Sequence, residues 1–193
     1  RFFDRCVFKE CDFTRAVGTG ARWSGCRFLG CQFDGSDMEF ADFSGAEFVS
    51  SQGGTPTKVL GSGFNATIMR GTRFENFSVQ GSSFAQSDFT KAQLINCEIM
   101  DGTYEGCLFN KAELKNVSFA NANVEFIDFT DANLQNTYLP LMQLPYAFGI
   151  DVEKLEKEHT YHIKLITNET ELSKYIDDYN KIYHKSWKNK EPY

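Results

Sequence analysis

A five-residue spacing of large apolar residues runs through most of this 193-residue chain. It begins at Phe8 and continues to Phe48 with one skipped position, then resumes one residue out of step at Phe64 and continues to Leu139. A small residue lies two positions before nearly every large one, as Cys26 lies before Phe28. Because a period of five belongs neither to a helix nor to a strand, the spacing indicates a stacked repeat architecture.

Each five-residue unit has a simple physical interpretation. Side chains alternate along an extended segment, so the large residue and the small residue two places earlier point the same way, and the residue between them points out. The remaining two residues must turn the chain, and glycine or asparagine often stands there, as at Gly25 and Asn96. Four units then close one coil of about twenty residues, and the coils stack about 4.8 Å apart.

The repeats resemble those of the pentapeptide-repeat family, whose units read roughly Ala-Asp/Asn-Leu/Phe followed by two variable residues. Close matches are Ala41-Asp42-Phe43, Ser87-Asp88-Phe89, Ala112-Glu113-Leu114 and Ala132-Asn133-Leu134. The resemblance covers about residues 4–144 and implies an all-β fold, a right-handed four-sided β-helix. The unit pattern is broken at Gly18, where a large residue belongs, and at Phe77, Val117 and Ile127, where a small one belongs. We expect the coil to bulge at those levels.

The chain divides into a repeat domain, residues 1–144, and a C-terminal part, residues 145–193. The stretch 49–58 is rich in turn-forming residues and predicts a loop that leaves the β-helix wall, with Val59 again facing inward. Such a loop either carries recognition or is a tolerated insertion. The chain opens inside a repeat, so we expect a piece excised from a longer protein; a native start capped by a dimer partner is the alternative.

Residues 145–193 predict a cap over the last coil followed by an amphipathic helix, so the appendage is expected to be mostly helical. Asn168 and Glu171 suit a capping box. Apolar residues then recur at three- and four-residue spacing. They are Leu172, Tyr175, Ile176, Tyr179, Ile182 and Tyr183. This stripe is expected to pack on the last coil, on a second copy through self-association, or on a following domain.

The six cysteines all fall at the small inward position of a unit. They are Cys6, Cys11, Cys26, Cys31, Cys97 and Cys107. At that position a free cysteine behaves as a small buried hydrophobe, and parallel Cβ directions on stacked coils disfavour bridging. We therefore expect reduced thiols and a reducing cytosol.

The sequence contains no recognisable catalytic constellation. Its three histidines, His159, His162 and His184, lie in the tail, and neither a phosphate-binding loop nor a nucleophile motif is present. We expect no enzymatic activity from these residues, no cofactor and no metal. No apolar run is long enough to span a membrane, and the net charge of −6 disfavours nucleic acid.

Function is therefore expected at the outer faces, where apolar residues are exceptions. Candidate partner-binding residues are Leu29, Phe40, Ile95, Met100, Leu108 and Phe126, together with Gly53, Gly54, Thr55 and Pro56 of the loop. A cluster of such residues marks a partner site, whereas scattered ones carry no meaning. Periodicity leaves open which of the two applies.

Two functions fit these expectations. The first is a non-catalytic protein-recognition module, the partner- or substrate-binding domain of a larger protein. The chain resembles the β-helix of bacterial type III secreted effectors that are HECT-like ubiquitin ligases, and this resemblance implies secretion by a bacterium and delivery into a host cytoplasm, where the domain would bind a host protein. The second is a stand-alone DNA mimic that binds type II topoisomerase, because quinolone-resistance proteins of the pentapeptide-repeat family share Cys-x-Phe units such as Cys26-Arg27-Phe28. Mimicry needs a continuous acidic stripe, and 12 basic residues dilute the 17 acidic ones in residues 1–139.

Overall fold

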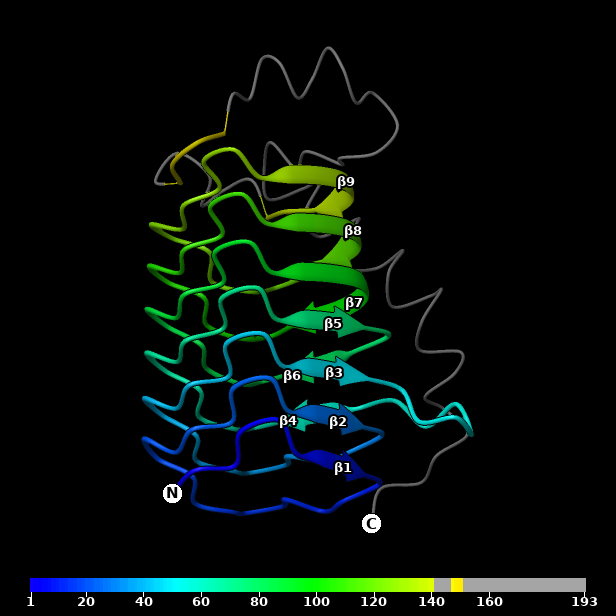
Figure 1. The fold of residues 1–193 in the computed structure, drawn as a ribbon. Coiled ribbons are helices and arrows are strands. Elements are labelled where there is room, and N and C mark those ends of the chain that lie inside the picture. Colours follow the sequence, from blue (N-terminus) through cyan, green and yellow to red (C-terminus); the bar gives the residue numbers. More distant parts are fainter. Residues whose placement is uncertain (141–146, 151–193) are drawn as a thin grey trace.

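The computed structural model describes residues 1–140 and 147–150, which form a four-sided β-helix, as the sequence predicts (Figure 1). Every regular element in these residues is a strand. The strands are β1 (Val7–Lys9), β2 (Arg27–Leu29), β3 (Glu47–Val49), β4 (Lys58–Leu60), β5 (Arg73–Glu75), β6 (Ser78–Gln80), β7 (Gln93–Met100), β8 (Glu113–Ser118) and β9 (Asn133–Tyr138). All pairings between them are parallel.

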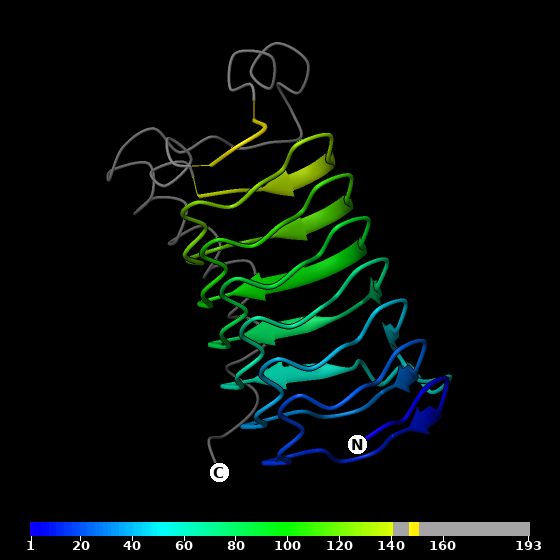
Figure 2. The ribbon, with the colours of Figure 1, turned by 60° about the vertical axis from the view of Figure 1, so that its left-hand side comes forward.

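Stacked coils place equivalent residues above one another in four walls, and successive coils appear as parallel rungs in Figure 2. Wall 1 contains the inward residues Phe3, Trp23, Phe43, Met69, Phe89, Phe109 and Phe129. Wall 2 contains Phe8, Phe28, Phe48, Phe74, Leu94, Leu114 and Leu134. Wall 3 contains Phe13, Phe33, Val59, Val79, Ile99, Phe119 and Leu139, and wall 4 contains Gly18, Met38, Phe64, Phe84, Tyr104 and Val124.

The loop after β3 accounts for the change of register. Phe8 pairs with Phe28 and Phe28 with Phe48, so those coils are twenty residues long. Phe48 then pairs with Phe74, which makes the coil that carries the loop six residues longer. Six residues equal one full unit plus one, and this explains a shift of one. Val59 is 1% exposed and faces inward, so that prediction is confirmed.

Each corner is made by one residue in the left-handed region of backbone space. Glycine takes this conformation without strain, and Gly30 does so with φ of 64°. Within residues 1–140 and 147–150, sixteen residues other than glycine also adopt it, among them a column of asparagines whose side chains bond from coil to coil. Asn116 Nδ2 donates to Asn96 Oδ1 at 2.9 Å, and Asn136 Nδ2 donates to Asn116 Oδ1 at 2.8 Å.

Aromatic rings fill the axis of the β-helix. In wall 2 the centroids of Phe8 and Phe28 are 5.3 Å apart and nearly parallel, and those of Phe28 and Phe48 are 4.8 Å apart. Parallel pairing continues without interruption through the levels of Val117 and Ile127, so the expected bulge there is wrong. These side chains, and Phe77, are accommodated inside the coil, each less than 5% exposed.

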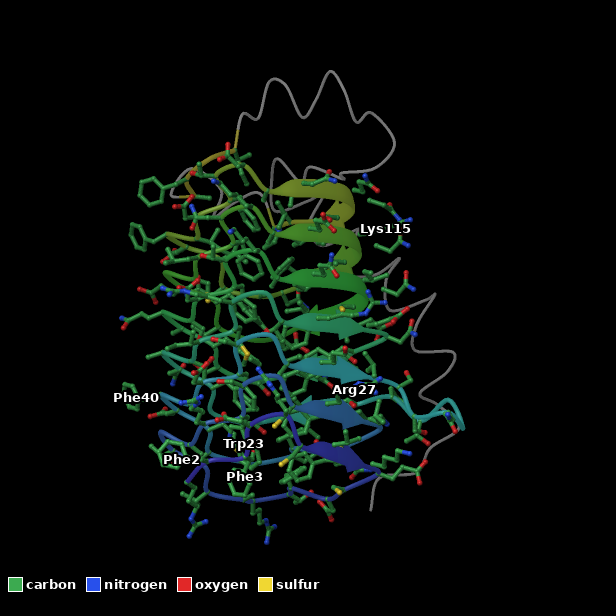
Figure 3. The ribbon with its side chains drawn as sticks, viewed as in Figure 1. Phe2, Phe3, Trp23, Arg27, Phe40 and Lys115 are labelled. Carbon is green, nitrogen blue, oxygen red and sulfur yellow. The ribbon has the colours of Figure 1, made fainter. Side chains whose placement is uncertain are left out.

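The first coil is less buried than the rest because, among the residues that the structure describes, no coil lies beneath it. Phe3, Phe8 and Phe13 are only partly buried, although Phe3 still stacks on Trp23 at 4.2 Å (Figure 3). At the other end, 147–150 add one further strip of chain to wall 1. The predicted cap and helix, with Leu172, Tyr175, Ile176, Tyr179, Ile182 and Tyr183, lie outside the described residues.

Candidate protein-binding surface

One outer row of wall 1 alternates between apolar and charged residues. It consists of the outward residues immediately before the wall 1 centres, and each is bridged to the next, one coil away. The row is Phe2, Arg22, Asp42, Ile68, Asp88, Leu108, Asp128 and Phe148. From Asp42 onward every second residue is apolar, so hydrophobic side chains recur every two coils, about 9.6 Å apart.

The exposed hydrophobic residues gather on this wall. Ile68 is 38%, Leu108 40% and Phe148 58% exposed. Phe40 and Phe126 occupy the corner that leads into wall 1, and they are 63% and 48% exposed. Of the nine exposed large hydrophobic residues in the described part of the chain, six lie on wall 1 or this corner. We call these six the apolar surface: Phe2, Phe40, Ile68, Leu108, Phe126 and Phe148.

Phe40 and Phe126 also have an unusual backbone. Their φ angles are 59° and 58°, in the left-handed region that bulky side chains rarely adopt. The equivalent residues in neighbouring coils are smaller or more flexible: Gly20, Ala66, Gln86 and Gly106. Folding therefore tolerates two exposed aromatic residues at positions where glycine is the least strained choice. Strained residues of this kind are often retained for function.

The aspartates of the row are held firmly in place. Asp128 Oδ1 accepts the Thr130 amide at 2.8 Å, and its Oδ2 accepts Asn110 Nδ2 at 2.8 Å. Partial burial acts to raise the pKa of Asp128, but these hydrogen bonds outweigh it, so the pKa lies below its ordinary value. Asp42 and Asp88 are arranged alike. Each accepts a hydrogen bond from the backbone amide two residues later in the chain and a second one from a side chain of the coil below. The row therefore presents ordered, ionised carboxylates between its apolar residues.

The structure separates the six outward apolar residues that the sequence singles out. Phe40, Leu108 and Phe126 belong to the apolar surface. Leu29 and Ile95 lie on wall 2, where Ile95 is flanked in register by Glu75 and Lys115. Met100 lies on wall 3 and packs on Ala120 and Tyr138. Figure 3 shows Phe2 and Phe40 on the side of the stack opposite Arg27 and Lys115 of wall 2.

Three members of the apolar surface were missed by sequence reasoning: Phe2, Ile68 and Phe148. Each lies one residue before a wall 1 position, as Leu108 does. The sequence pattern that could have revealed them is the recurrence of outward apolar residues at multiples of one coil length. To follow this pattern past residues 49–58 one must know the length of that coil, and the structure supplies it.

The loop forms a separate site. It links β3 to β4, between walls 2 and 3, and projects on the side away from Phe40 (Figures 1 and 3). Gly53, Gly54 and Thr55 are exposed and Pro56 is half-buried. The Ser51 amide donates to the Thr55 carbonyl at 2.8 Å, which closes the loop on itself.

Thr57 anchors the base of the loop. Its side chain is fully buried, and its hydroxyl lies 2.8 Å from the carbonyl oxygen of Val49. The Thr57 hydroxyl oxygen also accepts the Cys31 amide at 3.2 Å. Gly30 lies beneath the loop, where an added Cβ would come within 2.9 Å of the Ser51 Cβ. The loop is thus a compact projection tied to the coil below it.

Comparison with known proteins identifies the repeats. The sequence profile described as pentapeptide repeats matches this chain in eight copies, over residues 19–48, 67–101 and 105–137. The chain belongs to the pentapeptide-repeat family. No curated protein sequence matches it.

Solved pentapeptide-repeat structures are similar to this chain over much of its length. Rfr23 from the cyanobacterium Cyanothece 51142 is 13% identical, with 74% of this chain and 88% of that chain covered and a TM-score of 0.44. HetL from Nostoc sp. strain PCC 7120, which is involved in heterocyst differentiation regulation, is 13% identical, with 77% and 83% covered and a TM-score of 0.38. QnrB1, a plasmid-mediated fluoroquinolone resistance protein, is 14% identical, with 93% and 98% covered and a TM-score of 0.33.

The interior of this pentapeptide-repeat domain is packed. All six cysteines are free. Burial raises the pKa of Cys97 and of Cys107 to about 12, which keeps these thiols protonated and unreactive. Cys6 is exposed instead, because its coil is the first. A cavity of about 10 Å³ between walls, lined by aromatic and aliphatic side chains, is too small for a substrate.

Neither a metal site nor a membrane span emerges from the described residues. Within 1–140 and 147–150, no three histidine, cysteine, aspartate or glutamate side chains are grouped so that they could hold a metal ion. His159, His162 and His184 lie outside these ranges. In the same part of the chain, no helix has the length and apolar character that crossing a membrane requires.

Proposed function

We propose that this pentapeptide-repeat domain is a non-catalytic protein-recognition module that binds its partner through the apolar surface on wall 1. The observation that carries the proposal is the concentration of six exposed hydrophobic residues on one wall and its corner. Grouped exposed hydrophobics mark interaction sites, and repeat solenoids present long flat surfaces to partners. The packed interior supports the same assignment, because it leaves the outer walls as the place where binding occurs.

We also propose that the domain serves a larger bacterial protein as its partner- or substrate-binding part. We propose that this larger protein is a secreted ubiquitin-ligase effector that binds host proteins, because the repeats resemble the β-helix of such effectors. Its catalytic cysteine would then lie outside these 193 residues, because all six cysteines here occupy the small inward position of a repeat unit and four of them are buried. Free thiols suit a reducing cytosol such as that of a host cell.

The test uses two matched substitutions. Leu108→Asp places a charge in the apolar surface, and Leu60→Asp places one on wall 3, where Leu60 is 49% exposed. Both proteins and the unmodified chain are used to capture partners from host lysate, with quantitative mass spectrometry of what is retained. We expect one partner to be lost with Leu108→Asp and kept with Leu60→Asp. Equal retention by all three proteins would overturn the assignment of wall 1.

The alternative function, protection of type II topoisomerase by DNA mimicry, is favoured by one observation, the projecting loop. The charges oppose it. Asp4 pairs with Arg22 at 2.9 Å, and Asp88 pairs with Arg70, so basic residues interrupt the carboxylates of wall 1. Removing residues 51–56 restores twenty-residue spacing and gives a clean loopless variant. Quinolone protection of gyrase by the full chain, lost in that variant, would establish the alternative.

A further inference from the structure

The chain leaves the described coils on wall 1 itself. The Phe148 amide donates to the Ile127 carbonyl at 2.8 Å, and the Phe129 amide donates to the Phe148 carbonyl at 2.9 Å. At the next residue, a Cβ added to Gly149 would lie 2.3 Å from the Thr130 nitrogen, so the strip of chain is pressed against the coil below. Residues 151–193 therefore start from the wall that carries the apolar surface.

The spacing of that surface fits a helix laid along the stack. Ile68, Leu108 and Phe148 follow one another every two coils, about 9.6 Å apart. Residues seven apart in an α-helix lie on one face and about 10.5 Å apart. A helix parallel to the stacking axis would thus bring one residue of each heptad over one apolar residue of wall 1. Over two intervals the mismatch is about 2 Å, which side-chain rotamers absorb.

The tail sequence has this seven-residue period. Leu172 and Tyr179, Tyr175 and Ile182, and Ile176 and Tyr183 are each seven residues apart. With 100° between successive residues, a helix would place these six residues on one face. The apolar residues of the tail therefore repeat with nearly the same spacing as those of the wall.

We infer that residues 168–185 dock in cis on wall 1 as an amphipathic helix, with the stripe from Leu172 to Tyr183 over Ile68 and Leu108. The stripe would be about 16 Å long, which spans three to four coils. The connection of residues 151–167 reaches up to about 56 Å, far more than the four coils, about 19 Å, from Phe148 back to Ile68.

The docked tail covers the surface to which we assign partner binding, so this inference rests on the proposed function for its biological meaning. It also defines the partner's chemistry. A partner that displaces the tail would present a helix with apolar residues seven apart on one face. The isolated chain would then bind such a partner more weakly than a chain whose tail cannot dock.

Photo-crosslinking of the full chain tests the placement. A benzophenone amino acid replaces Leu108 in one protein and Leu60, on wall 3, in a matched control. We expect the Leu108 probe to give crosslinks at monomer mass that map to residues 168–185, and the Leu60 probe to give none there. Crosslinks from Leu108 that map elsewhere, or equal yields from both probes, would overturn the inference. Crosslinks at dimer mass would overturn it too and assign the surface to a second copy.

Substitutions in the tail complete the test. Tyr179→Asp places a charge in the stripe, whereas Asn180→Asp lies off it. We expect Tyr179→Asp to lower the Leu108 crosslink yield about tenfold and Asn180→Asp to leave it unchanged. Partner capture separates this inference from the proposed function. If only the inference fails, crosslinks are absent while Leu108→Asp still abolishes capture; if only the function fails, crosslinks form while capture is indifferent to Leu108→Asp.

Discussion

Replacing Tyr104 by phenylalanine should stabilise this β-helix. Tyr104 is 1% exposed, and its ring stacks on Phe84 at 5.4 Å and meets the edge of Phe119 at 5.6 Å. Its hydroxyl has no hydrogen-bond partner within the part of the chain that the structure describes. The hydroxyl lies over Gly102, where an added Cβ would come within 2.6 Å of the Ser82 carbonyl oxygen. The ring is thus well packed while its polar atom is not satisfied.

The magnitude follows from the cost of burying an unpaired polar group. That cost is about 1–3 kcal/mol, and phenylalanine removes it while keeping both ring contacts. A few tenths of a kcal/mol are lost with the dispersion contacts of one oxygen atom. We expect a net gain of about 1–2 kcal/mol in the free energy of unfolding. For a chain of this size the melting temperature should rise by about 2–8 °C.

Thermal unfolding followed by circular dichroism measures the change. The matched control is Phe109→Tyr, which adds a hydroxyl to a ring that is 0% exposed in the same core. It should lower the melting temperature by a similar amount or more. A lower melting temperature for Tyr104→Phe would refute the reasoning, because the hydroxyl would then have a favourable partner. A water is a poor candidate for that partner, since the adjoining cavity of about 10 Å³ is lined by apolar side chains.

Four further outcomes are expected. Thr57→Val should lower the free energy of unfolding by about 1–3 kcal/mol in denaturant titrations, because the buried Cys31 amide loses its acceptor. Asn116→Ala should lower the free energy of unfolding by about 1–2 kcal/mol in the same assay, because the coil-to-coil hydrogen bonds are lost and alanine is strained at a φ of 55°. An unchanged denaturation midpoint would contradict this. Iodoacetamide at pH 8 should label the native protein at exposed Cys6 and spare Cys107, whose pKa is about 12; mass spectrometry of the labelled peptides checks this. The pKa of Asp128 is lower in the folded than in the unfolded protein, so its contribution to the free energy of unfolding is complete above about pH 4 and is lost as the pH falls through the folded pKa. Asp128→Asn removes this contribution, so the melting temperature of the variant should fall less steeply below pH 4.

The five-residue spacing was enough to predict the interior. It assigned inward and outward positions correctly even at Val59, which follows the irregular stretch, because side-chain alternation depends only on local backbone geometry. It placed Cys97 and Cys107 in the core for the same reason. Exposure of Cys6 escaped it, because a coil at the end of a stack is buried by its neighbour on one side only.

That Phe40 and Leu108 lie on the same side of the β-helix could not be predicted from the sequence, for a different reason. A register shift of one residue is produced by an insertion of one, six or eleven residues, and each length rotates the later coils by a different number of quarter turns. The structure shows six, so Asp42 pairs with Ile68 and the residues before and after the loop align on one wall. Whether outward apolar residues cluster depends on this alignment and not on their pattern within either half.

The left-handed corner at every fifth residue sets the steps in which such a chain changes length during evolution. Gain or loss of five residues keeps every inward position inward, yet it turns all later walls by a quarter. An extra unit between Ile99 and Tyr104 would leave Ile68 where it is and carry Leu108 to the adjacent side. A lineage that depends on this surface is therefore confined to duplications and deletions of twenty residues, while one that has abandoned it is free to drift by five.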